Sequence, residues 1–259
     1  MGDRLVVLGT GTCQLEEHRV ASSVLIELAG LRLVFDFGRG VATRLAALGL
    51  RQDDVAHVAL SHFHVDHLSD LLPYLHAGSW SLIDPRTRDL HVWGPPGLEA
   101  LMTGLLELFE SVLRDGGFGV EVHEVAGDSM TIEGHEFRFV DLPPAGNRGL
   151  RFASGEITCA LTGDSHFHEQ EVEFLTGADV AVIDAGHLGD DDIVELASRS
   201  GARIVVCSHL YRELDREALA MRAAGRGFGG EIIVGEDLMT FDLSRGIAGL
   251  RPGRARRGA

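Results

Sequence analysis

The sequence predicts one α/β domain in which two β-sheets pack face to face with helices on the outside. Two β-rich blocks, made of short apolar runs that glycines separate, each lead into helical stretches. The apolar fraction of 45% and the charged fraction of 24% are those of a globular protein, and 259 residues can bury a substantial core. Sheets and helices in this order favour two sheets with helices covering their outer faces.

The first half of the chain begins with strands. We expect strands at residues 5–8, 22–28, 32–37, 55–60 and 91–93. Helical spacing of apolar residues, as at Val41, Leu45 and Leu48, predicts helices over 40–48, 68–76 and 98–113. The last of these follows two prolines, Pro95 and Pro96, which the start of a helix tolerates.

The second half repeats this order. A mostly β stretch is expected at 120–125, 136–140, 150–153 and 157–161. Helices over 169–175, 191–200 and 212–224 then alternate with strands at 180–183 and 203–207, and strands at 231–234 and 238–241 complete the domain. We expect residues 1–243 to form a single domain and residues 244–259, which hold five arginines among glycines, to form a flexible tail.

Composition limits the partners. The formal net charge is −16, whereas proteins that bind long nucleic acids normally present a basic field, so an extended nucleic acid is not the expected partner. The apolar runs are too short to cross a bilayer and no signal-peptide pattern opens the chain, so we expect a cytoplasmic protein. Three widely spaced cysteines form neither a disulfide framework nor a CxxC zinc motif.

The residues that can carry chemistry gather directly after the strand expected at 55–60. The segment Ser61-His62-Phe63-His64-Val65-Asp66-His67 holds three histidines and one aspartate. Imidazole nitrogens and carboxylate oxygens are ligands of divalent metals such as zinc. Residues two apart on an extended strand end share a face, so His62 and His64 can bind one ion. The turn that follows directs Asp66 and His67 toward a second ion, and the segment therefore predicts a metal site.

This segment resembles the H-x-H-x-D-H motif of the metallo-β-lactamase fold superfamily. Further motifs resemble the ribonuclease Z and cyclic phosphodiesterase branch in order and spacing, namely Gly9-Thr10-Gly11, Arg19, Ser22-Ser23, Asp36 with Gly38 and Gly40, and Gly94-Pro95-Pro96-Gly97. The resemblance extends from residue 4 to about residue 243. It implies a four-layer αββα sandwich of the metallo-β-lactamase type.

The resemblance also implies six metal ligands. His62 and His64 would bind a first ion, and Asp66, His67 and His209 would bind a second. Asp164 would bridge both ions. The resemblance further implies that Asp36 orients a ligand histidine through a hydrogen bond. Zinc is the expected cofactor, with manganese and iron as alternatives, and one or two ions are expected.

One ligand that the resemblance implies is missing. The family has a further histidine for the first ion shortly before the strand that here contains Gly149-Leu150-Arg151-Phe152. Pro143 stands about where this ligand belongs, and proline cannot bind a metal. Three substitutes stay open, Asp141, His166 and His168, as does a first ion that is weakly held or absent.

The resemblance implies a metal-dependent hydrolase, and we expect a phosphodiesterase that acts on a small or cyclic phosphodiester through a metal-bound hydroxide. Asp66 or Asp164 would orient the nucleophile, and His187 or Asp184 would protonate the leaving group.

Other functions and partners stay open. An acyl hydrolase of thioesters, lactones or β-lactams is one alternative, and a non-catalytic metal- or ligand-binding protein with a degenerate first site is another. The segment 115–119 is too short for the basic arm with which that branch grips tRNA, so a small-molecule substrate is expected. A homodimer stays open as the oligomeric state.

Overall fold

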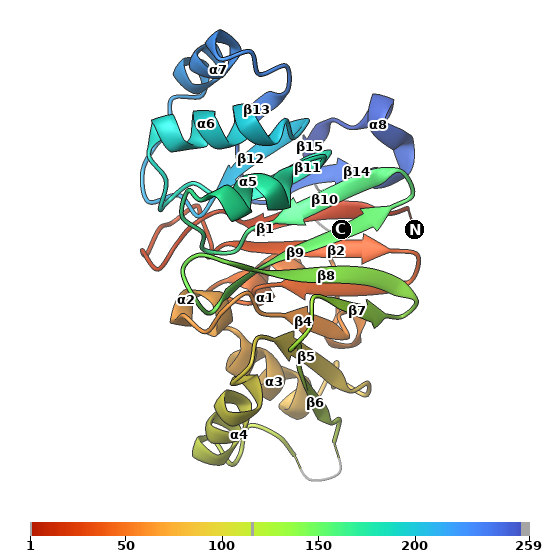
Figure 1. Ribbon diagram of the computed structural model, residues 1–259. Coiled ribbons are helices and arrows are strands. Elements are labelled where there is room, and N and C mark those ends of the chain that lie inside the picture. The colour runs from red at the N-terminus through yellow and green to blue at the C-terminus, as the bar shows by residue number, and fades with distance from the viewer. Residues whose placement is uncertain (1, 115–116, 255–259) are drawn as a thin grey trace.

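The computed structural model describes residues 2–114 and 117–254. Two β-sheets face each other, and helices lie on the outside of each sheet (Figure 1). The predicted fold class, a sandwich of two sheets between layers of helices, is confirmed. In the described part of the chain, no helix is long and apolar enough to cross a membrane. Residues 115–116 lie outside the described residues. They begin the segment 115–119, which is too short for a tRNA-gripping arm.

The larger sheet has eight strands in the order β15-β14-β1-β2-β3-β4-β5-β6. Their bounds are β1 Arg4–Gly9, β2 Ser23–Leu28, β3 Leu31–Phe35, β4 His57–Ala59, β5 Leu90–Gly94, β6 Val120–Glu124, β14 Met239–Asp242 and β15 Pro252–Arg254. Strands β3 to β6 are mutually parallel. Their carboxyl ends therefore lie along one edge of the sheet.

The smaller sheet has seven strands in the order β13-β12-β11-β10-β9-β8-β7. Their bounds are β7 Ser129–Ile132, β8 His135–Leu142, β9 Asn147–Ser154, β10 Ile157–Leu161, β11 Val180–Asp184, β12 Ile204–Ser208 and β13 Glu231–Val234. Strands β10 to β13 are parallel, so their carboxyl ends also share an edge.

The helices connect these strands. They are α1 Val41–Ala47, η1 Gln52–Asp54, α2 Val65–Leu68, α3 Leu71–Trp80, α4 Leu98–Leu108, α5 Glu169–Leu175, α6 Asp190–Ser200, α7 Arg216–Gly225, η2 Leu243–Arg245 and α8 Gly246–Gly249. The side chain of Asp215 accepts a hydrogen bond from the Ala218 amide and so caps the start of α7, and α6 ends at Gly201, whose φ is 62°. These two helix ends are thus placed by ordinary capping residues.

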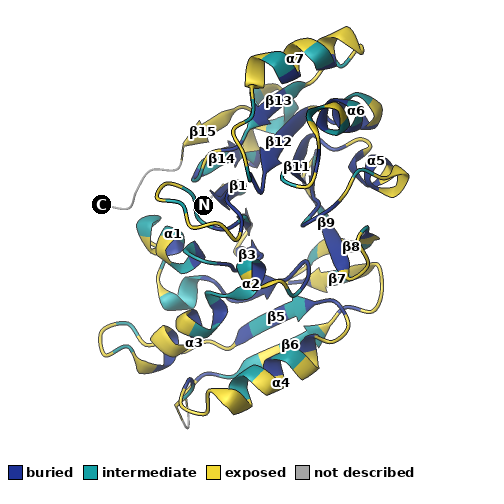
Figure 2. Cartoon of the chain, turned by 90° about the vertical axis from the view of Figure 1, so that its left-hand side faces the viewer, coloured by how far each residue is buried: buried dark blue, intermediate teal, exposed yellow. Residues whose placement is uncertain are grey.

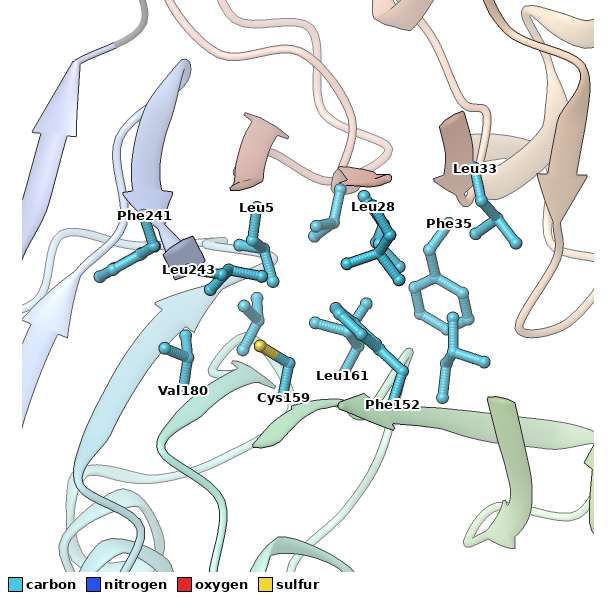
Figure 3. Close-up of a cluster of buried hydrophobic side chains, with 14 of the residues drawn as sticks. Leu5, Leu28, Leu33, Phe35, Phe152, Cys159, Leu161, Val180, Phe241 and Leu243 are labelled. Atoms are coloured by element: carbon cyan, nitrogen blue, oxygen red, sulfur yellow. The ribbon is translucent and has the colours of Figure 1, made fainter. Parts of the chain in front are cut away.

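The main core lies between the sheets. Figure 3 shows side chains of the larger sheet, such as Leu5 and Phe35, facing Phe152, Leu161 and Val180 of the smaller one. The alternate residues of the same strands point outward and form two further apolar clusters beneath the helices. Figure 2 shows that buried positions concentrate in the strands while the outer helices carry the exposed ones. This packing holds the two carboxyl edges against each other.

The observed elements differ from the prediction at several internal places. The helix expected at 212–224 begins only at Arg216. The helix expected at 68–76 is observed as α3, which begins at Leu71, and the short α2 precedes it, because the Asp70 amide donates to the Phe37 carbonyl and so leaves the helical pattern. The helix expected to reach residue 113 ends at Leu108. Strand β7 was not expected; its residues alternate in burial only weakly, and it forms by pairing with β8.

The segment expected to be a tail contains regular structure. Strand β15 pairs antiparallel with β14, and α8 precedes it. The side chain of Leu250, between them, is fully buried and belongs to the core between the sheets. An apolar side chain that enters the core gives the surrounding chain a fixed place. Residues 255–259 lie outside the described part of the chain.

Candidate metal centre

The expected ligands meet where parallel strands of both sheets end. Residues 61–67 follow β4 of the larger sheet, whereas Asp164 follows β10 and His209 follows β12 of the smaller sheet. All of them except His64 and Asp66 are buried. Residues that are far apart in the sequence therefore line one site at the joint edge of the sandwich.

Asp66, His67 and His209 form a compact group around one carboxylate oxygen of Asp164. His67 Nε2 lies 3.0 Å from Asp164 Oδ1, and His209 Nε2 lies 3.5 Å from the same oxygen. Asp66 Oδ2 lies 3.4 Å from His209 Nε2. With Asp164 this group, called here the second position, offers four donor atoms.

His62 and His64 form the other group, called here the first position. His62 Nε2 lies 3.7 Å from Asp164 Oδ2, and the two imidazole rings are 4.3 Å apart. Together with Asp164 they provide ligand atoms that all lie within 4.8 Å of one another. This position has three protein donors, one fewer than the second position.

Several donor atoms in this site are buried and lack a hydrogen-bond partner among the described residues. They are His62 Nε2, His67 Nε2 and Asp164 Oδ1. A buried polar atom without a partner costs about 1–3 kcal/mol. Divalent cations at the two positions would satisfy these atoms, and the donor set of imidazoles and carboxylates suits such cations. The residues therefore fit a divalent metal.

Asp36 holds two of these histidines in place. Its Oδ2 lies 2.8 Å from His67 Nδ1, which leaves Nε2 as the nitrogen that faces the site. Its two oxygens also accept hydrogen bonds from the Ser61 amide and hydroxyl, at 2.7 and 2.9 Å. Ser61 Oγ in turn lies 2.9 Å from His62 Nδ1. The contact expected from Asp36 to a ligand histidine is present.

Asp164 is positioned by a residue that sequence reasoning missed. Asn147 Oδ1 accepts a hydrogen bond of 3.1 Å from the Asp164 amide, and Asn147 Nδ2 donates to the Thr162 carbonyl, also at 3.1 Å. Neither Asn147 nor Ser61 belongs to a spacing pattern that indicates a role, because each acts through hydrogen bonds to residues that only the pairing of neighbouring strands brings close.

Carboxylates dominate the electrostatics of the site. Burial alone would lower the pKa of His209, but hydrogen bonds to Asp184 and Asp66 and the charge of Asp164 raise it to about 9. For His62, burial and the neighbouring His67 lower the pKa to about 4, so this ligand is neutral at pH 7. Protons on His67 and His209 thus balance the surrounding negative charge, and a bound cation would take over that role.

Asp184 and His187 form a hydrogen-bonded pair beside the second position. Asp184 Oδ2 lies 2.6 Å from His187 Nδ1, while Asp184 Oδ1 accepts from the Gly186 amide at 2.8 Å. The imidazole of His187 is partly exposed and stacks with that of His209 at 5.3 Å. The hydrogen bond to Asp184 raises the pKa of His187, which outweighs the opposing effect of burial. This pair can therefore hold a proton at the mouth of the site.

The three substitutes considered for the missing ligand lie elsewhere in this structure. Asp141 points to solvent, with 87% of its side chain exposed, and pairs with Arg148 Nε at 2.7 Å. His166 is exposed, and its ring lies 5.3 Å from that of His187. His168 caps α5 by accepting from the Gln170 amide at 3.3 Å. The carbonyl of Pro143 accepts from the His166 amide, so the turn that replaces the missing histidine packs against the loop of Asp164.

Comparison with known proteins gives one family and several similar proteins. The family described as "Beta-lactamase superfamily domain" matches residues 32–210. A ribonuclease Z of Mycobacterium sp. (strain KMS) is 26% identical over 280 residues, which cover 94% of this chain and 97% of that protein. The metallo-β-lactamase fold protein YhfI from Bacillus subtilis superposes with a TM-score of 0.73 at 19% identity, covering 92% of this chain and 98% of the other. A diphosphatase from the PhnP family superposes with a TM-score of 0.68 at 20% identity, covering 92% and 96%.

Proposed function

Because the chain belongs to the beta-lactamase superfamily, we propose that it is a metal-dependent hydrolase that cleaves a small or cyclic phosphodiester. The similar proteins include a ribonuclease Z and a diphosphatase of the PhnP family, whose names both denote cleavage at phosphorus. Their similarity supports a phosphoester substrate over an acyl substrate. The superfamily as a whole does not decide between these bonds.

The observation that carries the proposal is the convergence of donors from both sheets on Asp164. His62, His67 and His209 lie within 3.0 to 3.7 Å of its carboxylate oxygens. A divalent cation bound there would supply an activated water as nucleophile and positive charge for the oxygens of the phosphate. We assign the first position to His62, His64 and Asp164, and the second to Asp66, His67, Asp164 and His209.

Other residues of the site move or hold protons. His187 Nδ1 bonds to Asp184, so Nε2 is the nitrogen that can donate a proton to a leaving group. The raised pKa of His187 keeps that proton available near neutral pH. Asp66, half-buried with Oδ2 facing His209 Nε2, is placed to orient the attacking water.

We propose that the metal is zinc and that the two positions retain their ions unequally. The second position has four protein donors and the first has three, because Pro143 replaces a ligand. Protein carrying His123→Gln, which excludes an ion at the histidine pair of β5 and β6, should retain close to one ion per chain when it is purified without added metal and dialysed at length. His209→Ala should remove that ion, whereas His64→Ala should leave it in place. Two ions per chain that survive dialysis equally would contradict the unequal positions. Metal content is read by elemental analysis.

A substrate panel tests the reaction. With zinc or manganese added, bis(p-nitrophenyl) phosphate and cyclic phosphodiesters should turn over, and thioesters, lactones and β-lactams should not. His209→Ala and Asp164→Asn should each lower kcat at least about 100-fold, since each removes a metal ligand. Turnover of acyl substrates alone would instead indicate an acyl hydrolase. Metal binding without any turnover would indicate a ligand-binding protein.

RNA is the second candidate substrate, because the similar curated proteins are named ribonuclease Z and match 94% of this chain. The net charge of −16 weighs against a long RNA, since phosphate contacts supply most of such binding. A precursor tRNA with a 3′ extension, assayed beside the small substrates, separates the two. Cleavage of the precursor at a kcat/KM above that of the small esters would favour RNA.

A further inference from the structure

A second cluster of imidazoles lies on the larger sheet, outside the metal centre. His57 on β4, His91 and Trp93 on β5, and His123 on β6 form a continuous stack of rings, called here the edge cluster. The rings of His57 and His91 stack at 5.0 Å, those of His91 and His123 at 5.3 Å, and those of Trp93 and His123 at 3.9 Å. β6, which carries His123, is the last strand of the sheet and pairs only with β5 (Figure 1).

The strand register explains why these side chains meet. Val92 and Val122 point into the apolar cluster beneath the helices. Their neighbours therefore point to the other face of the sheet, the face that looks toward the smaller sheet. His91 pairs in register with Glu121, and Trp93 pairs with His123. A carboxylate and two imidazoles thus share one face of two adjacent strands.

Two imidazole nitrogens in this cluster form a hydrogen bond. His91 Nδ1 and His123 Nε2 lie 3.0 Å apart, and the tautomers decide which of them donates. Two imidazoles that bind one tetrahedral zinc at about 2.0–2.1 Å hold their nitrogens about 3.3 Å apart. The observed separation is close to that value, and an ion that binds both nitrogens would replace the proton they share and turn the two rings toward a common point.

The surroundings leave the pair reachable from solvent, with His123 neutral. Burial and the neighbouring His91 lower the pKa of His123, so its imidazole is neutral and carries a lone pair at pH 7. Both histidines are half-buried, which leaves access from solvent. Glu121 is exposed on the same face and can rotate toward them, while Glu133 Oε1 lies 3.7 Å from His57 Nε2 and adds negative charge.

We propose that His91 and His123 chelate a divalent transition-metal ion, with Glu121 as a third ligand. The ligand set of two imidazoles and one carboxylate suits zinc, nickel or copper. Because one histidine belongs to β5 and the other to β6, the ion fastens the edge strand to the sheet. The role is structural and does not depend on the proposed hydrolase activity.

Trp93 provides a direct measurement, since its ring stacks on His123 at an interplanar angle of 14°. The chain has two tryptophans, so Trp80→Phe leaves Trp93 as the sole emitter. In this background, with the metal centre first loaded with zinc, Ni²⁺ should quench the fluorescence saturably. His91→Gln and His123→Gln should each weaken the Ni²⁺ affinity at least 10-fold, and Glu121→Gln several-fold. His76→Gln, an exposed histidine on α3, should leave it unchanged.

A second measurement follows the fold itself. Ni²⁺ should raise the Tm of the Trp80→Phe protein by a few degrees and leave the Tm of Trp80→Phe/His123→Gln unchanged. The proposal is overturned by quenching that does not saturate, or by equal Ni²⁺ affinity with and without His91 and His123. It is also overturned by quenching that disappears with His64→Gln and persists with His123→Gln, because the ion would then lie in the metal centre.

Discussion

At the scale of single residues, two residues of the metal centre adopt an unfavourable backbone conformation. Asp36 has a φ of 62° and His209 a φ of 53°, in the left-handed region that non-glycine residues rarely occupy. Each costs of order 1–3 kcal/mol and persists only where surrounding contacts hold it. For Asp36 those contacts are the hydrogen bonds to Ser61 and His67. The strain turns the chain sharply at the strand ends and directs both side chains into the site.

Gly163 also has a left-handed backbone conformation, and it gives a testable prediction. Its φ is 65°, and an added Cβ would lie 2.4 Å from Asn147 Oδ1 and 2.7 Å from Ser61 Cβ. Gly163→Ala should therefore push Asp164 away from the imidazoles and lower both metal retention and kcat/KM at least 10-fold. Gly201→Ala is the matched control, because its φ of 62° is similar and a Cβ there would meet no atom within 4 Å. The control should cost only about 1 kcal/mol of stability. Equal metal content in the two variants would contradict the close packing.

Glu171 on α5 is fully buried, and neither carboxylate oxygen has a hydrogen-bond partner in the described structure. Burial and the charge of Asp184 raise its pKa to about 8 from an ordinary 4.5. A raised pKa favours the protonated folded state, so the stability that this proton provides is complete below pH 4.5. It is lost as the pH rises to 8.

The substitution Glu171→Gln should remove this pH dependence. The free energy of unfolding of the variant should exceed that of the wild type increasingly from pH 5 to pH 8, by up to several kcal/mol at about 1.4 kcal/mol per unit of pKa. Urea unfolding at a series of pH values measures the difference. Glu173→Gln, an exposed position on the same helix, should follow the wild type. Parallel curves for wild type and Glu171→Gln would mean that Glu171 is ionised in the fold.

The candidate site could be predicted from the sequence as far as its ligands form recognisable motifs. The histidines and aspartates of residues 62–67, with Asp164 and His209, stand in recognisable segments at strand ends, and the structure brings these residues together. Ser61 and Asn147 could not be predicted, because their roles depend on hydrogen bonds between neighbouring strands of one sheet, Ser61 with Asp36 and Asn147 with Asp164. Nor could the sequence decide whether Asp141 turns inward; its pairing with Arg148 at the surface depends on the register of β8 and β9.

At the scale of elements, the periodicity of apolar residues predicted the helices and strands that bury one face in the core. The bounds expected for α5 and β13 agree with the structure, since their apolar pattern and flanking polar residues coincide. The prediction failed where contacts with other segments of the chain determine the local structure. Strand β7 exists by pairing with β8, and a hydrogen bond to Phe37 separates α2 from α3. The segment after residue 243 has a composition typical of a tail, yet one side chain, Leu250, anchors it in the core.

Leu250 is therefore the residue on which the packing of α8 and β15 depends. Leu250→Ala should lower the free energy of unfolding by about 2–4 kcal/mol, because it removes a fully buried side chain from the core between the sheets. Ile247→Ala, a partly buried neighbour, should cost less. Chemical denaturation of both variants tests this. A loss below 0.5 kcal/mol for Leu250→Ala, within the range of about ±0.5 for surface substitutions, would show that the segment contributes little.

At the scale of the whole molecule, the metal centre joins the two sheets. Residues 62–67 come from the larger sheet, and Asp164 and His209 come from the smaller one, so any cation between them ties the carboxyl edges together. His67 Nε2 and His209 Nε2 each lie 3.0 to 3.9 Å from carboxylate oxygens of Asp66 and Asp164. Bound metal thus favours the folded sandwich and has no comparable site in the unfolded chain.

Removal of the metal should consequently lower the stability of the entire sandwich. A site held at 100 times its Kd contributes about 2.7 kcal/mol, which for a chain of this size corresponds to a Tm shift of about 5–10 °C on chelation. His123→Gln serves as the background for this measurement, so that an ion in the edge cluster does not contribute. Adding His209→Asn should lower the Tm before chelation and abolish the further shift that the chelator causes. Chelation that shifts both proteins equally would mean that the stabilising ion does not lie between the sheets.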